Sequence, residues 1–186
     1  MCGILAISNP DCSSDTKLNI YNGLTSLQHR GQDGFGICCD DKAIHKNGTI
    51  TNFDLSDFDI FNKNKPYFIG HVRYHTAGTN NNINNVQPIV IKNEIRISLV
   101  HNGNIINFEE IKQNNDFYKS HMDIRGLGDS DSCMIAAIFL SKLESLTNNN
   151  EKNINQINVL QTCIYLMNIL EGSFCLCILI ENFGMV

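Results

Sequence analysis

The sequence predicts an α+β fold made of layered sheets and helices in one domain. Apolar, β-branched stretches typical of strands gather early in the chain and again near its C-terminus, and stretches of helical period lie mainly between them. At 186 residues the chain has the length of one domain, able to bury roughly 70% of its unfolded surface. A composition of 42% hydrophobic and 18% charged residues is that of a globular chain.

The first half of the chain is expected to hold one helix among several strands. Strands are expected over residues 2–7, 35–39, 43–50 and 67–73. Within the third stretch, Asn47-Gly48 is the strongest short hairpin signal, so two strands are expected to pair across it. Ser14-Asp15 predicts the cap of the helix. Its apolar face follows helical spacing through Leu18, Tyr21, Leu24 and Leu27.

The second half is expected to begin with a hairpin and to continue with three helices and a strand. The hairpin joins 88–92 to 95–101. Asn107 with Glu110 forms a capping box for a short helix, and Ser130 or Asp131 caps the next one. That second helix carries the apolar stripe Met134, Ile135, Ile138, Phe139 and Leu143. The third helix, over 154–170, is expected to bury Ile157, Leu160, Ile164 and Met167, before a strand over 173–181.

Charge and hydropathy exclude several classes of partner. The net charge is −5 and no block of Lys and Arg is present, which argues against duplex nucleic acid or an anionic membrane as partner. No apolar stretch approaches the roughly 20 residues needed to span a bilayer, and the N-terminus lacks the basic and apolar regions of a secretory signal. A cytoplasmic protein is therefore expected.

The cysteines do not predict a metal site or a disulfide framework. There are eight, but no C-x-x-C occurs. Cys175 and Cys177 lie two apart in the last predicted strand, so they share a face and are expected to be small core residues. His71 and His75 have a weak zinc-like spacing, but they lie on a strand and turn rather than a helix. Reduced thiols are the expectation.

Cys2 is the first candidate for chemistry. Removal of Met1 would leave one residue with both a thiol and a free α-amine. The amine has a reference pKa of roughly 7.7–8, so it is a usable base near neutral pH. The thiolate is strongly nucleophilic. Cys2 alone is also consistent with the start of a buried strand that has no catalytic role. The residues that follow are therefore needed to distinguish the two interpretations.

A cysteine that attacks an amide needs oxyanion donors and groups that hold the substrate. Asn102-Gly103 directly follows a predicted strand, where an amide side chain and a backbone N–H can converge. Arg73, at the end of its strand, suits a bidentate grip on a carboxylate, and Asp131 suits an ammonium group. The alternatives are a surface ion pair for Arg73, a helix cap for Asp131 and a simple turn at Asn102-Gly103.

Six motifs in order resemble the class II glutamine amidotransferases, which are N-terminal-nucleophile hydrolases. The motifs are Met1-Cys2-Gly3-Ile4, Leu27-Gln28-His29-Arg30-Gly31-Gln32-Asp33, Gly70-His71-Val72-Arg73-Tyr74, Thr76-Ala77-Gly78, His101-Asn102-Gly103-Asn104 and Ser130-Asp131-Ser132. The second motif most resembles the glutamine phosphoribosylpyrophosphate amidotransferases (amidophosphoribosyltransferases). His75 and Cys133 depart from the family pattern, in which a small residue or proline and an acidic residue are common.

The resemblance implies a four-layer αββα sandwich, and it implies a role for each candidate residue. Cys2 attacks the glutamine side-chain amide, and its own α-amine moves the protons. Asn102 and Gly103 form the oxyanion hole. Arg73 binds the α-carboxylate of glutamine and Asp131 its α-ammonium. The remaining two residues with implied roles are Thr76, which lines the same pocket, and Arg30, which fixes the nucleophile.

The resemblance also implies a domain organisation and partners. Residues 2–186 correspond to a glutaminase domain cut short at its C-terminal end, without the phosphoribosyltransferase domain of the family. No cofactor is expected in this chain, because Mg²⁺ would belong to the phosphoribosyltransferase domain. The expected partners are L-glutamine and an ammonia-accepting synthase domain or subunit. Whether the chain forms a homo-oligomer is left open.

Three alternatives remain at the level of sequence. The chain is a glutamine-binding module without catalysis, or a glutaminase subunit that serves another ammonia acceptor. The third is a different amide hydrolase with a terminal cysteine, such as a penicillin or bile-salt amidase. Arg73 and Asp131 speak against this last alternative, because its substrates lack a free amino-acid head group.

Overall fold

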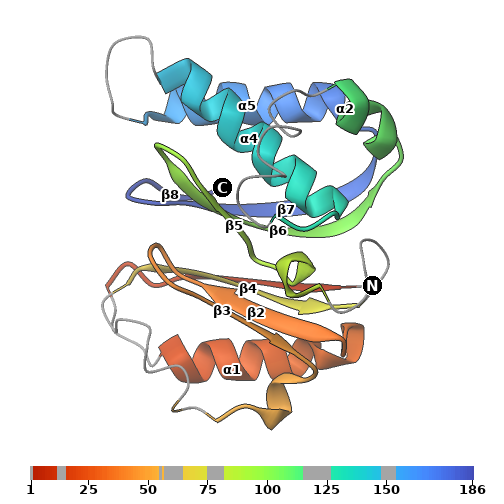
Figure 1. Cartoon of the computed structure of the whole chain (residues 1–186). Coiled ribbons are helices and arrows are strands. Elements are labelled where there is room, and N and C mark those ends of the chain that lie inside the picture. The colour runs from red at the N-terminus through yellow and green to blue at the C-terminus, as the bar shows by residue number, and fades with distance from the viewer. Residues whose placement is uncertain are drawn as a thin grey trace.

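Two antiparallel sheets lie face to face between layers of helices (Figure 1). The computed structural model describes residues 2–11, 16–54, 56, 65–74, 82–114, 127–147 and 154–186. The first sheet has the order β1-β4-β2-β3 and contains β1 (Gly3–Ser8), β2 (Gly34–Cys38), β3 (Ala43–Asn47) and β4 (Tyr67–Arg73). The second has the order β5-β6-β7-β8 and contains β5 (Ile89–Lys92), β6 (Arg96–Ile105), β7 (Gly172–Ile180) and β8 (Gly184–Met185).

Helices cover the two outer faces. Helix α1 (Thr16–Leu27) packs on the first sheet, and α4 (Asp131–Thr147) with α5 (Gln156–Ile169) covers the second (Figure 1). The αββα sandwich implied by the family resemblance is thus confirmed. Shorter helical segments are η1 (Gln28–Arg30), η2 (Ile50–Asn52), η4 (Ile83–Asn85) and α2 (Phe108–Asn114). In the part of the chain that the structure describes, no helix is long and apolar enough to cross a membrane.

The apolar core follows these layers. One cluster fills the space between the two sheets, with Cys38, Ile69, Val100 and Leu179 at its centre. A second lies between α1 and the first sheet, and the largest lies between α4, α5 and the second sheet. Helix α4 is buried nearly all round, which confirms its predicted apolar stripe.

The prediction of a hairpin at Asn47-Gly48 is wrong. Strand β3 pairs instead with β2, and the tight connection lies at residues 40–42, where the Cys39 amide donates to the Lys42 carbonyl. Gly48 has a φ of +86°, and there the chain leaves the sheet for η2. The glycine therefore ends a strand rather than turning a hairpin, because the left-handed conformation serves either purpose.

The capping box predicted at Asn107 is also wrong. The Asn107 side chain is used in a different contact: its Nδ2 donates to the Ile169 carbonyl at 2.8 Å, and its Oδ1 accepts from the Glu171 amide at 3.0 Å. Asn107 therefore joins the start of α2 to the turn between α5 and β7. Sequence spacing alone does not distinguish the two uses of such a side chain.

The predicted buried faces of α1 and α5 need correction. In α1 the buried positions are Thr16, Ile20 and Leu24, and Leu18 is exposed. In α5 they are Val159, Thr162 and Leu166. The four residues expected to face the core are exposed instead: Ile157, Leu160, Ile164 and Met167. Because α5 is apolar on more than one side, its composition did not show which side packs.

The C-terminal strand also differs from expectation in detail. Cys175 is exposed, so it is not the core residue that was predicted, whereas Cys177 is half-buried and packs against the cluster between the sheets. The turn after β7 leads into β8, which pairs antiparallel with it. Residues Ser14-Asp15, Cys12 and His75, on which further predictions fall, lie outside the described residues.

Candidate active site

The first described residue, Cys2, directly precedes the edge strand β1 of the first sheet. Strand β1 runs antiparallel to β4 with Gly3 opposite Val72, which brings Cys2 to the end of β4 at Arg73 and Tyr74. The Tyr74 amide donates to the Cys2 Sγ at 3.4 Å, and the same sulfur lies 3.5 Å from the Tyr74 carbonyl oxygen. The thiol is thus held against the backbone where β4 ends.

The segment after α1 fixes the same chain end from another side. The Nε of Arg30 donates to the Cys2 carbonyl at 2.8 Å. The next residue must be glycine, because a Cβ on Gly31 would lie 2.4 Å from the carbonyl carbon of Arg73. A Cβ on Gly3 would lie 2.8 Å from Val72. Close packing therefore explains both glycines, against backbone at Gly31 and against side chains at Gly3, and it holds Cys2 between η1 and β4.

Cys2 opens onto a small cavity formed by residues from five parts of the chain. The cavity is lined by Cys2, Arg73, Tyr74, Asn85, Gln87, His101, Gly103, Ser130, Asp131 and Ser132. Its volume is about 30 Å³, enough for one or two water molecules. Four of the residues that the sequence singles out for chemistry thus share one cavity: Cys2, Arg73, Gly103 and Asp131.

Two residues of opposite charge lie on this cavity. Arg73 is buried at the end of β4, and Asp131 opens α4 from the facing sheet's helix layer. Burial acts to raise the pKa of the Asp131 carboxyl, but hydrogen bonding to His101 and to the Ser132 amide outweighs it and lowers that pKa below its ordinary value. A carboxylate at neutral pH follows, which suits a cationic group on a ligand.

The glycine expected at the end of a strand lies inside β6 instead. Gly103 pairs with Phe174 and Asn102 with Cys175, so both are within the β6–β7 ladder. Gly103 has a φ of +153°, and a Cβ there would lie 2.2 Å from the Ser173 carbonyl oxygen. Asn102 is not among the described residues that line the cavity. It shares the face of β6 on which Val100 packs between the sheets.

The electrostatic setting of the thiol is mixed. Burial raises the pKa of the Cys2 thiol above its ordinary value, while the hydrogen bond from Tyr74 and the charge of Arg73 act in the opposite direction. A thiol of this kind needs a nearby base to become a thiolate. Its own α-amine, once Met1 is removed, is the base that chemistry suggests.

Of the predicted site residues, Thr76 lies outside the described residues. Sequence reasoning did not assign roles to Tyr74, Gln87, His101 and Ser132, which all line the cavity. Tyr74, His101 and Ser132 lie within the six motifs that resemble the family, so the sequence pointed to the segments that contain them. Gln87 belongs to none of these motifs, and no sequence signal points to it.

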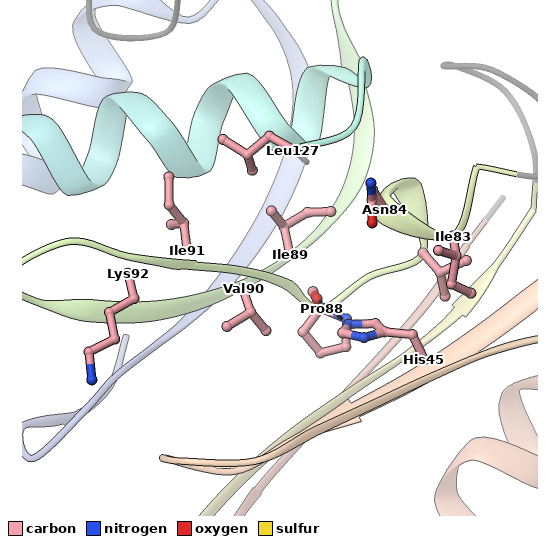
Figure 2. A pocket seen from close by; sticks show the side chains of 10 residues that line it. His45, Ile83, Asn84, Pro88, Ile89, Val90, Ile91, Lys92 and Leu127 are labelled. Atoms are coloured by element: carbon pink, nitrogen blue, oxygen red, sulfur yellow. Dashed lines mark hydrogen bonds between the residues drawn. The ribbon is translucent and has the colours of Figure 1, made fainter. Parts of the chain in front are cut away.

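Two larger cavities lie away from Cys2. One, of about 350 Å³, lies beside β5 (Figure 2), and apart from His45, Asn84 and Lys92 its lining is aliphatic and proline side chains. The imidazole of His45 is hydrogen-bonded to the Pro88 carbonyl at 2.7 Å. The other, about 510 Å³, lies between α5 and β7 and is mostly apolar. Within the described ranges no group of three or more potential ligands forms a metal site.

The chain is similar to a group of amidophosphoribosyltransferases. It is 38% identical over 117 residues to the Archaeoglobus fulgidus protein, covering 60% of this chain and 25% of the relative. It is 33% identical over 171 residues to the Methanocaldococcus jannaschii protein, covering 86% and 35%. The chain thus spans about a quarter to a third of the length of these relatives. No protein-family model matches it.

Solved structures agree with this similarity. A glutamine phosphoribosylpyrophosphate amidotransferase from B. subtilis, complexed with ADP and GMP, aligns with a TM-score of 0.59 and 28% identity. A structure described as the allosteric regulatory enzyme of purine biosynthesis aligns with a TM-score of 0.63 and 25% identity. The alignments cover 97% of this chain and 35% and 36% of the two solved chains.

Proposed function

The chain is similar to amidophosphoribosyltransferases, and on that premise we propose that it hydrolyses the side-chain amide of L-glutamine. The products are glutamate and ammonia, and Cys2 is the nucleophile. The observation that carries the proposal is the shared cavity of Cys2, Arg73, Gly103 and Asp131. These residues are far apart in sequence, and they supply a nucleophile, an oxyanion donor and two charges of opposite sign.

The charges account for substrate recognition. The guanidinium of Arg73 is a fixed cation suited to the α-carboxylate of glutamine. The lowered pKa of Asp131 keeps its carboxyl anionic for the α-ammonium. Thr76 is proposed to line the same pocket, and Arg30 to hold the nucleophile through its bond to the Cys2 carbonyl. A substrate with a free amino-acid head group fits this pair better than the penicillin and bile-salt amides considered above.

The reaction proceeds through a thioester. The α-amine of the trimmed Cys2 takes the thiol proton, and the sulfur attacks the amide carbon. The negative charge that develops on the carbonyl oxygen is stabilised by the Gly103 N–H and the Asn102 side chain. The amine then returns the proton to the leaving nitrogen, and ammonia departs. Water attacks the thioester through the same oxyanion site, releasing glutamate and restoring the thiol.

The described cavity must enlarge to admit glutamine. Its volume of about 30 Å³ is an order of magnitude below the roughly 300 Å³ at the low end of small-molecule sites. Tyr74, which lines the cavity, has an exposed side chain. Substrate binding therefore needs a rearrangement of side chains around Cys2.

The relatives suggest where the ammonia goes. Residues 2–186 are proposed as the glutaminase part of an amidophosphoribosyltransferase-like enzyme of purine nucleotide synthesis. The ammonia acceptor then lies on a synthase domain or on a separate subunit. The glutaminase step described here uses only groups of the chain itself.

The test is release of glutamate from glutamine by purified protein whose Met1 has been removed. Cys2→Ala should abolish release, whereas Cys163→Ala, which removes a half-buried thiol on α5, should leave it unchanged. A second variant, with one alanine inserted between Met1 and Cys2, keeps the thiol but displaces the amine, and it should also be inactive. Equal release from wild type and Cys2→Ala would refute the proposal.

Burial raises the pKa of the Cys2 thiol, which disfavours the thiolate and makes a glutamine-binding module without turnover the second candidate. Calorimetry separates the two: heat of binding without glutamate release identifies the module. Turnover by wild type and binding alone by Cys2→Ala identifies the enzyme.

A further inference from the structure

A buried cluster of hydrogen bonds lies directly behind the Asp131 carboxylate. Its centre is the Ser132 hydroxyl, which lies 3.0 Å from His101 Nδ1 and accepts from Gln87 Nε2 at 2.9 Å. Ser132, His101 and Gln87 are all buried. The Gln87 carbonyl oxygen in turn accepts the backbone N–H of His101. That N–H lies beyond the end of β5, so the side chain satisfies a donor that the sheet leaves unpaired.

The geometry determines which groups of the cluster donate hydrogen bonds and which accept them. Because Gln87 occupies one lone pair of the Ser132 oxygen, the hydroxyl proton points either to His101 or to Asp131. The Nε2 of His101 is buried without a hydrogen-bond partner among the described residues, and a bare lone pair there costs less than an unpaired N–H. His101 therefore carries its proton on Nδ1 and donates to Ser132. The Ser132 hydroxyl, 3.4 Å from Asp131 Oδ1, donates onward to that carboxylate.

The cluster holds one carboxylate oxygen and leaves the other open. Asp131 Oδ1 accepts the Ser132 backbone N–H at 2.8 Å and faces the Ser132 hydroxyl, with His101 Nδ1 at 3.7 Å. Within the described part of the chain no hydrogen-bond donor reaches Oδ2. Two donors on one oxygen fix the rotation of the carboxylate, so Oδ2 points in a set direction with its accepting capacity unused.

We propose that Ser132, supported by His101 and Gln87, is a positioning residue that orients the Asp131 carboxylate toward the α-ammonium group of the substrate. The inference rests on the proposed glutaminase activity and adds a specificity role to three residues that do not touch the reacting amide. The open Oδ2 is the oxygen that receives the ammonium. Without the Ser132 hydroxyl, the carboxylate loses one of its two orienting donors and rotates more freely.

The experiment compares L-glutamine with glutaramate, which is glutamine without its α-amine. In wild type, Ser132→Ala and Asp131→Asn, kcat/KM is measured for both amides by ammonia release. Ser132→Ala should lower kcat/KM for glutamine roughly tenfold or more, as expected for a lost hydrogen bond to a charged group, and leave glutaramate unchanged. Combined with Asp131→Asn, the losses should be less than multiplicative, because both act on one interaction.

Each outcome is informative. An inactive wild type would refute the glutaminase proposal itself. If wild type is active but Ser132→Ala slows both amides equally, the hydroxyl serves the fold or the nucleophile, and the positioning role is contradicted. No loss on either amide contradicts it as well. Ser145→Ala, a matched change on the exposed side of α4, should match wild type on both amides.

A second variant covers the case in which Ser132→Ala fails to fold. Ser132→Cys keeps nearly the same volume in the buried site but replaces the hydroxyl with a thiol, a weak hydrogen-bond former. It should show the same selective loss for glutamine. Alkylation of Cys2 by iodoacetamide, followed on the N-terminal peptide, should proceed at the wild-type rate in both variants, because the nucleophile is untouched.

Discussion

Gly103 lies where the chain has no room for a side chain. Its φ of +153° is rare for any other residue, and an added Cβ would lie 2.2 Å from the Ser173 carbonyl oxygen. We expect Gly103→Ala to lower the free energy of unfolding by roughly 1–3 kcal/mol through backbone strain, and further through the clash. Displacing this N–H should also reduce kcat about 10²–10³-fold. Denaturant unfolding and glutamate release measure the two effects.

Gly48 provides the matched control for that substitution. It also has a positive φ, +86°, but a Cβ there meets nothing within 4 Å. Gly48→Ala should therefore cost only about 1–2 kcal/mol and leave kcat unchanged. If Gly103→Ala costs no more than Gly48→Ala and retains activity, the close approach of β6 to β7 does not shape the site.

His71 is a buried imidazole that the proposed mechanism does not use. Burial lowers its pKa from 6.5 to about 3. The unfolded chain takes up a proton at this residue below pH 6.5 whereas the folded chain does not, so the free energy of unfolding falls as the pH drops toward 3. The slope is at most about 1.4 kcal/mol per pH unit for one proton. Urea unfolding between pH 7 and 5 should be less pH-dependent in His71→Leu than in wild type.

The exposed residue His29 serves as control, and His29→Gln should retain the wild-type pH dependence. Burial also lowers the pKa of His45, so the free energy of unfolding of His71→Leu still depends on pH. An unchanged slope in that variant would contradict the buried, neutral state of His71.

At the scale of elements, helix α5 shows that an apolar side chain is not always a buried one. Leu166 is 2% exposed and Leu160 is 60% exposed on the same helix. Leu166→Ala should therefore lower the free energy of unfolding by about 2–5 kcal/mol, and Leu160→Ala by no more than about 0.5 kcal/mol. Denaturant unfolding of the two variants decides this. A larger cost at Leu160 would mean that the helix packs by the opposite face.

The same helix shows where sequence reasoning was sufficient and where it was not. Strands β1 to β7, the order of elements and the largely buried α4 were predictable, because apolar runs and β-branched residues mark them directly. The face of α5 was not predictable, because both sides are apolar and only tertiary packing selects one. The predictions made from Asn47-Gly48 and Asn107 were wrong for a related reason, because each local sequence signal is compatible with two structures.

The candidate site was predictable to a similar degree. Cys2, Arg73, Asp131 and Gly103 were singled out from residue types whose chemistry is specific, and they share one cavity, while their roles stay predictions. The supporting residues were not found. Gln87 and Ser132 act through hydrogen bonds between segments 45 residues apart, and such contacts leave no pattern in the sequence.

At the scale of the whole molecule, the sandwich explains why so small a cavity gathers so many functional groups. The cavity lies at the level where β1 and β4 of one sheet meet β6 of the other, next to the start of α4. Each sheet contributes part of the chemistry: the first holds Cys2 and Arg73, and the second with its helix holds Gly103 and Asp131. The packing of the two sheets therefore sets the distance between the proposed nucleophile and the proposed oxyanion donor.

The central claim is that Cys2 attacks the side chain of glutamine. It is tested most directly with 6-diazo-5-oxo-L-norleucine, a glutamine analogue in which a diazo ketone replaces the amide. Attack by a thiolate expels nitrogen gas and leaves a stable thioether, which mass spectrometry locates on one peptide. Of the eight cysteines, Cys2 alone should be labelled in the Met1-trimmed protein, to one equivalent, and L-glutamine should protect it. An unlabelled Cys2, or labelling spread over the other cysteines and insensitive to glutamine, would contradict the account.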